Sequence, residues 1–311
     1  MRKKNIFLAG HNGMAGSAVL RLLKTKKKKY NILIKDKKQL DLTDQRKVYN
    51  FFKNNKIDSV IICAAKVGGI LANSKYGGEF IFNNLAIQNN IFEAAKVNHI
   101  KNLIFLGSSC IYPKFAKQPI KENYLLTGKL EESNEPYAIA KIAGVKMCEA
   151  YNKQFQFNYK CLMPCNMFGP NDNYDDKNSH FFSALIKKIY KAKKNKKNYI
   201  KLWGTGKAKR EVLYVDDLAN ACLFFLEKKT KHYLINIGSG IEHTISDYAK
   251  IIMKKFDIKL KIKFSGPKMD GTPRKLLNTK LAKKYGWNSK INLDKALDLT
   301  IDDFIKNKLY K

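Results

Sequence analysis

Acidic residues and arginine are both scarce in this sequence. Only 26 Asp and Glu residues stand against 60 Lys and Arg residues, which leaves a formal net charge of +34 at pH 7. Such an excess of cations favours binding to nucleic acid or to a charged membrane surface, because clustered cations release counterions from phosphates. Only five of these cations are arginines, however, and arginine is the better reader of phosphates and bases. Since the lysines are spread along the whole chain, we interpret them as compositional drift and expect no nucleic-acid partner.

Long hydrophobic runs and paired cysteines are absent as well. No apolar run approaches the ~18–20 residues of a membrane span, and residues 2–4 lead into the first apolar run without a signal-peptide pattern. The six cysteines are scattered rather than spaced as zinc ligands. We therefore expect a cytoplasmic protein with reduced thiols, no membrane partner and no metal.

What the sequence does contain is an alternation of short apolar runs and helical patterns over 311 residues. The apolar runs predict strands at residues 5–9, 30–35, 58–63, 102–107, 158–163 and 233–237. The segments between them predict helices near residues 14–25, 44–54, 83–97 and 135–154. Repeated βαβ units of this kind build a doubly wound parallel sheet of the Rossmann type, whose ligand lies at the carboxyl ends of the strands. We expect an α/β protein with this sheet and a smaller C-terminal substrate-binding lobe.

Three glycines follow the first predicted strand. The apolar run from Ile6 to Ala9 ends at Gly10, and Gly13 and Gly16 stand where a helical pattern takes over. A strand, a tight turn and a helix of this kind let the backbone approach a pyrophosphate, which the free amides of the helix N-terminus then hold. The spacing differs from the commonest dinucleotide fingerprint, so a plain turn between strand and helix is the alternative. The context nevertheless predicts a nucleotide-binding loop.

A second group of residues is suited to proton transfer. Tyr137 and Lys141 stand one helical turn apart, and Ser108 and Cys110 follow the strand predicted at residues 102–107. A phenol is a poor acid or base at neutral pH, but a lysine cation one turn away favours the phenolate, so we expect it to lower the pKa of Tyr137. A Tyr-x-x-x-Lys pair alone is weak evidence, and it gains weight here from the glycine loop upstream.

With both groups in view, the chain resembles the extended short-chain dehydrogenase/reductases and, within that superfamily, the GDP-L-fucose synthases. The resemblance runs nearly end to end, although the glycine and Tyr-x-x-x-Lys motifs mark only the superfamily. The more specific segments are Ser-Ser-Cys-Ile-Tyr-Pro from Ser108, Asn-Ser-His from Asn178 and Asp-Gly-Thr-Pro-Arg-Lys from Asp270. The resemblance implies an NADPH-dependent enzyme that epimerises C3 and C5 of GDP-4-keto-6-deoxy-D-mannose and reduces its C4 ketone to give GDP-L-fucose.

Two other functions remain open at this point. One is a related epimerase or reductase that acts on a different GDP-keto-sugar, against which the presence of both Cys110 and His180 argues. The other is a lysine-rich nucleic-acid-binding protein, against which the complete set of Ser108, Tyr137 and Lys141 argues.

The resemblance implies catalytic roles for five residues. Tyr137 is the acid that protonates the substrate oxygen, and Lys141 lowers its pKa and binds the nicotinamide ribose. Ser108 hydrogen-bonds the carbonyl that is reduced. Cys110 and His180 move the protons of epimerisation, because a thiol and an imidazole have pKa values near working pH. The alternatives are a helix-surface pair, a capping serine, a packed cysteine and a structural histidine.

Cofactor choice is read from the second predicted strand. The end of this strand carries one carboxylate, Asp36, among three lysines, Lys35, Lys37 and Lys38. Cations at this place bind the extra phosphate of NADP, whereas a carboxylate would bind the ribose hydroxyls of NAD. We therefore expect NADP (NADPH), although family members often carry arginine where Asn12 and Lys37 stand, which loosens this preference. The resemblance implies the following cofactor-binding residues: Gly10, Asn12, Gly13, Met14, Ala15, Gly16, Lys35, Lys37, Leu106, Gly107, Ser108, Ser109, Tyr137, Lys141, Pro164, Cys165, Asn166, Met167 and His180.

The GDP-sugar substrate is expected to bind cations and an aromatic ring. By resemblance Arg210 holds the diphosphate, Trp203 lies beside the base or sugar, Asp270 binds hydroxyls or the guanine edge, and Lys188 lies near them. A core tryptophan and a salt-bridging arginine are the alternatives.

The expected organisation follows from these assignments. We expect residues 1–170 to form an NADP-binding Rossmann domain to which 210–240 returns, and 171–209 and 241–311 to form the substrate-binding lobe. The resemblance also implies a homodimer packed through the helices predicted near residues 83–97 and 135–154.

Overall fold

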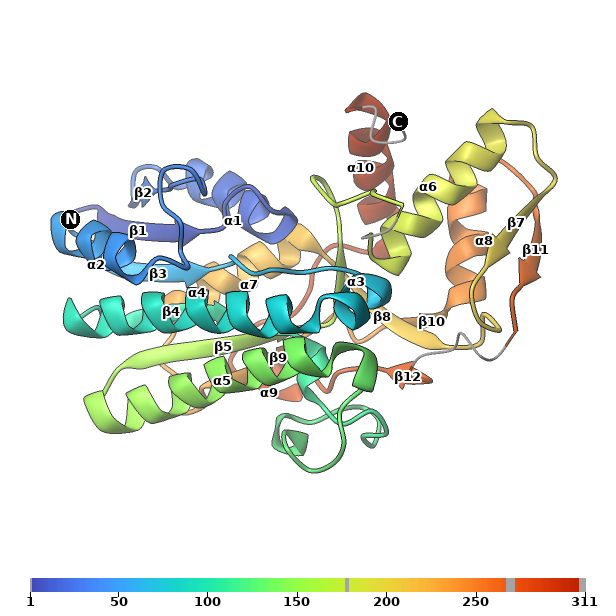
Figure 1. The fold of residues 1–311 in the computed structure, drawn as a ribbon. Coiled ribbons are helices and arrows are strands. Elements are labelled where there is room, and N and C mark those ends of the chain that lie inside the picture. The colour runs from blue at the N-terminus through green and yellow to red at the C-terminus, as the bar shows by residue number, and fades with distance from the viewer. Residues whose placement is uncertain (1, 177–178, 267–271, 308–311) are drawn as a thin grey trace.

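The fold is built on a central parallel sheet (Figure 1). In the computed structural model, which describes residues 2–176, 179–266 and 272–307, six parallel strands pair in the order β2-β1-β3-β4-β5-β9. Their apolar side chains are buried from both faces, as is usual for parallel sheets. The strands are β1 (Lys4–Ala9), β2 (Tyr30–Leu33), β3 (Ser59–Ile62), β4 (Asn102–Leu106), β5 (Asn158–Pro164) and β9 (Leu234–Ile237).

Helices cover both faces of this sheet. On one face α4 packs against α2 and α5, and on the other α1 packs against α7. These helices are α1 (Met14–Thr25), α2 (Gln45–Asn54), α4 (Gly77–Val97), α5 (Glu135–Phe155) and α7 (Val215–Glu227). Because the strands are parallel, all their carboxyl ends lie at one edge of the sheet, which faces the second unit at the right of Figure 1.

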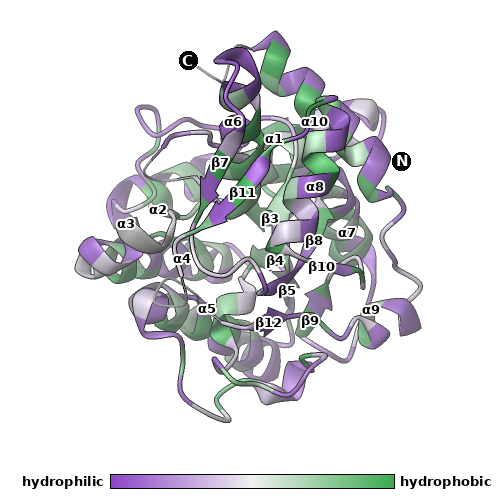
Figure 2. Ribbon diagram, turned by 90° about the vertical axis from the view of Figure 1, so that its right-hand side faces the viewer, coloured by the Kyte–Doolittle hydropathy of each residue, from purple (hydrophilic) through white to green (hydrophobic). Residues whose placement is uncertain are grey.

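The second unit has its own hydrophobic core, in which Phe182 packs against Phe168 and Tyr248. Its main sheet has the order β10-β8-β12, with β6 also paired to β8, and a parallel pair joins β7 to β11. Its elements are β6 (Asn166–Phe168), α6 (Phe181–Lys194), β7 (Tyr199–Leu202), β8 (Lys209–Tyr214), β10 (Glu242–Thr244), α8 (Ile245–Lys255), β11 (Lys261–Phe264), β12 (Arg274–Lys275) and α10 (Leu293–Lys306). Helices of both units carry hydrophobic and hydrophilic stretches side by side, as Figure 2 shows, because one side of each helix faces a core.

Short elements complete the described chain. These are α3 (Ile70–Lys75), α9 (Lys280–Lys284) and the 3-10 turns η1 (Ser109–Ile111), η2 (Glu122–Tyr124) and η3 (Glu132–Asn134). Over the ranges that the structure describes, no helix combines the length and the apolar character needed to cross a bilayer.

The doubly wound parallel sheet predicted from the sequence is confirmed. All six predicted strands and all four predicted helices are present, with boundaries that differ by a few residues. β8, near the point where the chain was expected to rejoin the first unit, pairs with β6, β10 and β12 instead of with the central sheet. The chain then returns through α7 and β9.

Candidate active site

The turn after β1 is closed by two glycines. Gly10 has a positive φ of 85°, and a Cβ on Gly16 would lie 2.0 Å from the Gly10 carbonyl oxygen, so neither position has room for a side chain. Gly13 is the N-cap of α1 and makes no side-chain cap, while a Cβ there would meet only the Gly10 oxygen at 3.8 Å. The first amides of α1 are therefore left uncapped beside open space, which suits the pyrophosphate of a dinucleotide.

The other residues predicted to bind the cofactor lie at the same edge of the sheet. Lys35 and Lys37 are exposed after β2, and the carboxylate of Asp36 accepts the backbone N–H of Gln39 at 2.9 Å. That local turn engages the one carboxylate of this lysine cluster. The turn before α1 contains Asn12, and α1 begins with Met14 and Ala15. The end of β4 and the residues after it are Leu106, Gly107, Ser108 and Ser109. The segment from the end of β5 into β6 consists of Pro164, Cys165, Asn166 and Met167.

Three of the predicted catalytic residues, Ser108, Cys110 and Tyr137, lie close together. Ser108 is the N-cap of η1, and its Oγ accepts the backbone N–H of Cys110 at 3.3 Å. The side chains of Ser108 and Tyr137 are hydrogen-bonded. The segment that follows β4 therefore places the Ser108 hydroxyl and the Cys110 thiol beside the first turn of α5, which carries the Tyr137 phenol.

The pKa of Tyr137 is raised, which is the opposite of the shift that the sequence predicts. Burial is the main cause, the nearby Cys110 raises it further, and the bond with Ser108 lowers it only in part. Lys141 does not offset these effects, because its Nζ donates to the Leu106 carbonyl at 2.8 Å and lies 5.8 Å from the centre of the Tyr137 ring. Burial also lowers the pKa of Lys141 to about 8. Among the described residues, no ion pair joins Lys141 to a carboxylate, so this buried lysine suits a ligand that supplies hydrogen-bond acceptors.

His180 is placed apart from these residues. It is the N-cap of α6, and its carbonyl accepts the backbone N–H of Ala184 at 2.9 Å. Its side chain is exposed, but the protein around the ring desolvates it in part, and this lowers the pKa of His180. Among the described residues, no hydrogen bond joins its ring to Ser108, Cys110 or Tyr137. The structure thus brings four of the five predicted catalytic residues together and leaves His180 in the second unit.

The predicted substrate residues belong to the second unit. Lys188 lies on α6, and its Nζ donates to the Lys201 carbonyl of β7 at 2.7 Å, two residues before Trp203. Trp203 is 56% exposed, so it is not a core tryptophan. Arg210 lies on β8, where its Nη1 donates to the Lys209 carbonyl.

Asp270 lies outside the described residues, as does Asn178 of the Asn-Ser-His segment.

Two polar residues of the site were not assigned from the sequence. Asn134, the N-cap of α5, donates from Nδ2 to the sulfur of Cys110 at 3.5 Å. Glu211 is fully buried on β8, where it accepts the backbone N–H groups of Gly240 and Leu277, and burial raises its pKa to about 7. The signal for each was a neighbouring residue that the sequence analysis had assigned: Asn134 comes three residues before Tyr137, and Glu211 directly follows Arg210.

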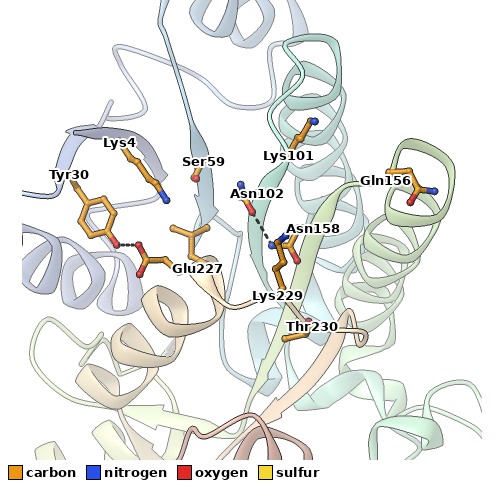
Figure 3. Close-up of a pocket in the computed structure, with 11 residues that line it drawn as sticks. Lys4, Tyr30, Ser59, Lys101, Asn102, Gln156, Asn158, Glu227, Lys229 and Thr230 are labelled. Carbon is orange, nitrogen blue, oxygen red and sulfur yellow. Dashed lines mark hydrogen bonds between the residues drawn. The ribbon is translucent and has the colours of Figure 1, made fainter. Parts of the chain in front are cut away.

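A hollow of about 540 Å³ lies at the opposite edge of the sheet (Figure 3). Lys4, Ser59, Asn102 and Asn158 line it, and each of them begins a strand of the central sheet. Ligands of open parallel sheets bind at the carboxyl ends of the strands, so this hollow is not the nucleotide site.

Known proteins match this chain over almost its whole length. The model of the NAD dependent epimerase/dehydratase family matches residues 6–238. The GDP-L-fucose synthase of Escherichia coli (strain K12) is 43% identical over 99% of this chain and 98% of its own, and GDP-L-fucose synthase 1 of Arabidopsis thaliana is 45% identical over 98% and 94%. A solved structure, the GDP-mannoheptose C4 reductase from Campylobacter jejuni with NADP bound, is 31% identical and aligns with a TM-score of 0.87 over 98% of this chain and 99% of its own.

The glycine turn, the Tyr137 and Lys141 pair and these full-length matches agree with one another. The chain belongs to the NAD dependent epimerase/dehydratase family and, within it, to the GDP-L-fucose synthases.

Proposed function

We propose that this protein converts GDP-4-keto-6-deoxy-D-mannose into GDP-L-fucose, by epimerising C3 and C5 and then reducing the C4 ketone with NADPH. The similarity to GDP-L-fucose synthases at 43–45% identity supports this reaction. The observation that carries it is the closeness of the Cys110 side chain to Tyr137, whose phenol is hydrogen-bonded to the side chain of Ser108. The thiol of Cys110 can remove a proton from carbon, and the hydroxyls of Ser108 and Tyr137 can bind and protonate a ketone oxygen. These three groups lie close together.

Reduction uses Ser108, Tyr137 and Lys141. NADPH supplies the hydride that reaches C4. Ser108 donates a hydrogen bond to the C4 oxygen, and Tyr137 gives that oxygen its proton as negative charge develops on it. The raised pKa of Tyr137 keeps the phenol protonated at neutral pH, as an acid must be. Lys141 holds the ribose hydroxyls of the cofactor and supplies positive charge beside the phenol.

Epimerisation uses the same ketone. C3 and C5 both flank C4, so removal of a proton from either carbon places the negative charge on the C4 oxygen, where Ser108 and Tyr137 stabilise it. Cys110, as thiolate, removes the proton from one face of the ring. His180 returns a proton to the opposite face. Because the two residues come from different units, the substrate must lie between them.

The cofactor is NADP(H). Gly10, Gly13 and Gly16 form the turn for its pyrophosphate, and the uncapped amides of α1 hold it. Lys35 and Lys37 accept the phosphate on the adenosine ribose.

The second unit is proposed to hold the GDP end of the substrate. Lys188, Trp203 and Arg210 supply charge and an exposed ring for the diphosphate and the sugar or base, and Asp270 is proposed to bind hydroxyls or the guanine edge. We keep the proposed division into a cofactor domain of residues 1–170 with 210–240 and a substrate lobe of 171–209 with 241–311. Its boundaries differ from the sheets at β6 and β8, which pair with each other in the second unit.

We also propose a homodimer in the cytoplasm. The helices α4 and α5 pack side by side, and α4 exposes Phe82 while α5 exposes Ile139. Exposed apolar side chains on neighbouring helices suit a symmetric helix-to-helix interface.

A second candidate is the reduction of a different GDP-keto-sugar, since the similar Campylobacter jejuni protein is named a GDP-mannoheptose C4 reductase. Incubating the purified chain with GDP-4-keto-6-deoxy-D-mannose or with a GDP-4-keto-heptose, and with NADPH or NADH, separates the two. We expect GDP-L-fucose by NMR and faster oxidation of NADPH than of NADH. Turnover of the heptose alone would contradict the proposal.

A further inference from the structure

The N-cap of α5 is unusual in where its side chain points. An N-cap asparagine normally accepts a hydrogen bond from a backbone N–H of the first helical turn, but Asn134 makes no such bond. Pro136, at the second helical position, has no N–H to offer. Instead Nδ2 of Asn134 donates to the sulfur of Cys110 at 3.5 Å, and its Oδ1 is buried without a hydrogen-bond partner. The side chain of Asn134 therefore faces the Cys110 thiol instead of capping α5.

The orientation of the amide suits a thiolate. A thiolate has no proton to donate, so only the N–H side of an amide can stabilise it, and bonds to a charged acceptor are stronger than neutral ones. Cys110 is thereby held twice: its backbone N–H is bonded to Ser108, and its sulfur accepts the Asn134 amide. The buried Oδ1 of Asn134 points to a ligand as well. A buried acceptor without a donor destabilises the protein, and a bound ligand could supply the missing donor.

We propose that Asn134 is the positioning residue for the epimerisation base. Its Nδ2 orients the Cys110 thiolate toward the carbons beside the ketone, and its Oδ1 accepts a hydrogen bond from a hydroxyl of the bound keto-sugar. This inference rests on the proposed function, since it assigns a partner to the base of that reaction. Asn134 acts on proton removal at carbon and has no part in hydride transfer.

Two variants separate the two atoms of the amide. Asn134→Asp keeps an acceptor oxygen but presents no donor to the sulfur, and Asn134→Ala removes both. Solvent deuterium exchange at C3 and C5, measured in D2O without NADPH, should fall about 10- to 100-fold in both variants. The KM for the GDP-keto-sugar should rise in Asn134→Ala more than in Asn134→Asp. The kcat for oxidation of GDP-L-fucose by NADP⁺, measured at saturating sugar and needing no epimerisation, should change less than about threefold.

Alkylation gives an independent readout of the thiolate. At a fixed pH, iodoacetamide should modify Cys110 more slowly in both variants, because the thiolate is the reacting form. The other thiols have pKa values raised by burial and react later: Cys63, Cys148, Cys161, Cys165 and Cys222. The matched control is Asn292→Ala, which removes an ordinary cap, the bond from the Lys295 N–H to Asn292, at the start of α10. It should lower stability and leave exchange unchanged.

Wild-type exchange in both Asn134 variants would overturn the inference. So would an equal loss of exchange and of GDP-L-fucose oxidation, because that pattern means that Asn134 only supports the helix. A wild-type chain that exchanges neither carbon would instead overturn the proposed function, and the inference with it.

Discussion

At the scale of single residues, burial shifts the pKa values of two groups that the proposed mechanism uses, Tyr137 and Lys141. It raises the pKa of Tyr137 and lowers that of Lys141 to about 8. The Tyr137 phenol is therefore protonated at neutral pH, while the Lys141 ammonium loses its proton only about one pH unit above neutral. An anionic cofactor beside Lys141 favours its charged form, and a charged Lys141 in turn stabilises the phenolate left after proton transfer.

Tyr137→Phe removes the transferable proton and keeps the ring. NADPH oxidation with the keto-sugar should fall by the ~10²–10⁴ typical of a lost general acid, while the fold is retained. Absorbance at saturating substrate measures this loss. The control is Tyr30→Phe, which removes a hydroxyl bonded to Glu227 at the opposite edge of the sheet and should not change the rate. A near wild-type rate for Tyr137→Phe would rule it out as the acid.

Lys160 is a second buried lysine, and it has no role in the proposed reaction. It is 1% exposed on β5, its Nζ donates to Asn158 Oδ1 at 2.7 Å, and burial lowers its pKa from 10.5 to about 7. The unfolded chain therefore binds one more proton than the folded chain between pH 7 and 10.5. The contribution of Lys160 is most destabilising below pH 7, and stability rises with pH through that window.

Lys160→Met should accordingly raise the free energy of unfolding at pH 7 by about 1–4 kcal/mol, with the lost bond to Asn158 offsetting part of the gain. It should also remove the rise in stability between pH 7 and 10.5. Urea denaturation at several pH values measures both effects, and the exposed Lys101→Met is the control. A destabilised variant with an unchanged pH profile would show that Lys160 is well solvated.

At the scale of elements, the turn between β1 and α1 separates a structural glycine from a binding glycine. Gly16→Ala should destabilise the fold by about 1–3 kcal/mol, because its Cβ would lie 2.0 Å from the Gly10 oxygen. Gly13→Ala has room in the free protein, so its stability should change by less than about 1 kcal/mol. Its methyl would occupy the approach of the pyrophosphate, and the Kd for NADPH should rise at least about tenfold. Denaturation and NADPH fluorescence titration measure the two effects. Unchanged NADPH affinity in Gly13→Ala would place the pyrophosphate elsewhere.

Element boundaries also show how far the sequence alone leads. The helix predicted at residues 14–25 matches α1, because its apolar pattern starts where the glycine turn ends. The helix predicted near 83 begins six residues earlier, at Gly77. Glycine pairs are poor helix formers, so propensity hides this turn. Glycine suits this turn because α4 lies close to α5 here: a Cβ on Gly77 would be 3.1 Å from Pro136.

For the candidate site, the sequence predicts which residues lie near one another better than it predicts their contacts. Helical spacing places Tyr137 and Lys141 on one face, and strand ends place Ser108 beside them. Spacing could not show that Lys141 would reach the carbonyl of Leu106, nor that Asn134 would turn from its helix to Cys110, because both depend on packing between β4 and α5.

At the scale of the whole molecule, the proposed homodimer would bury side chains that one chain leaves exposed. Phe82 is 68% exposed on α4. Phe82→Glu should convert a dimer into a 35.7 kDa monomer, since a charge at such an interface is costly to bury. Light scattering after gel filtration measures the mass. Phe115→Glu, at a phenylalanine that is 78% exposed outside α4 and α5, is the control and should stay dimeric. A wild-type chain that is monomeric at micromolar concentration would contradict the dimer.

The proposed mechanism depends at this scale on two units, since Cys110 follows the first sheet and His180 is the N-cap of α6. Cys110→Ala should abolish proton removal while leaving Ser108, Tyr137 and Lys141 in place, so that the ketone is either left unreacted or reduced without inversion. His180→Gln should allow exchange to begin and should yield partly epimerised product.

The most direct measurement is the position of deuterium in the product. The wild-type chain is incubated with GDP-4-keto-6-deoxy-D-mannose and NADPH in D2O, and the nucleotide sugar is analysed by NMR. One active site that both epimerises and reduces predicts GDP-L-fucose with solvent deuterium at C3 and C5 and with the hydride of NADPH at C4. A GDP-6-deoxyhexose of unchanged configuration, with no deuterium at C3 or C5, would contradict the account.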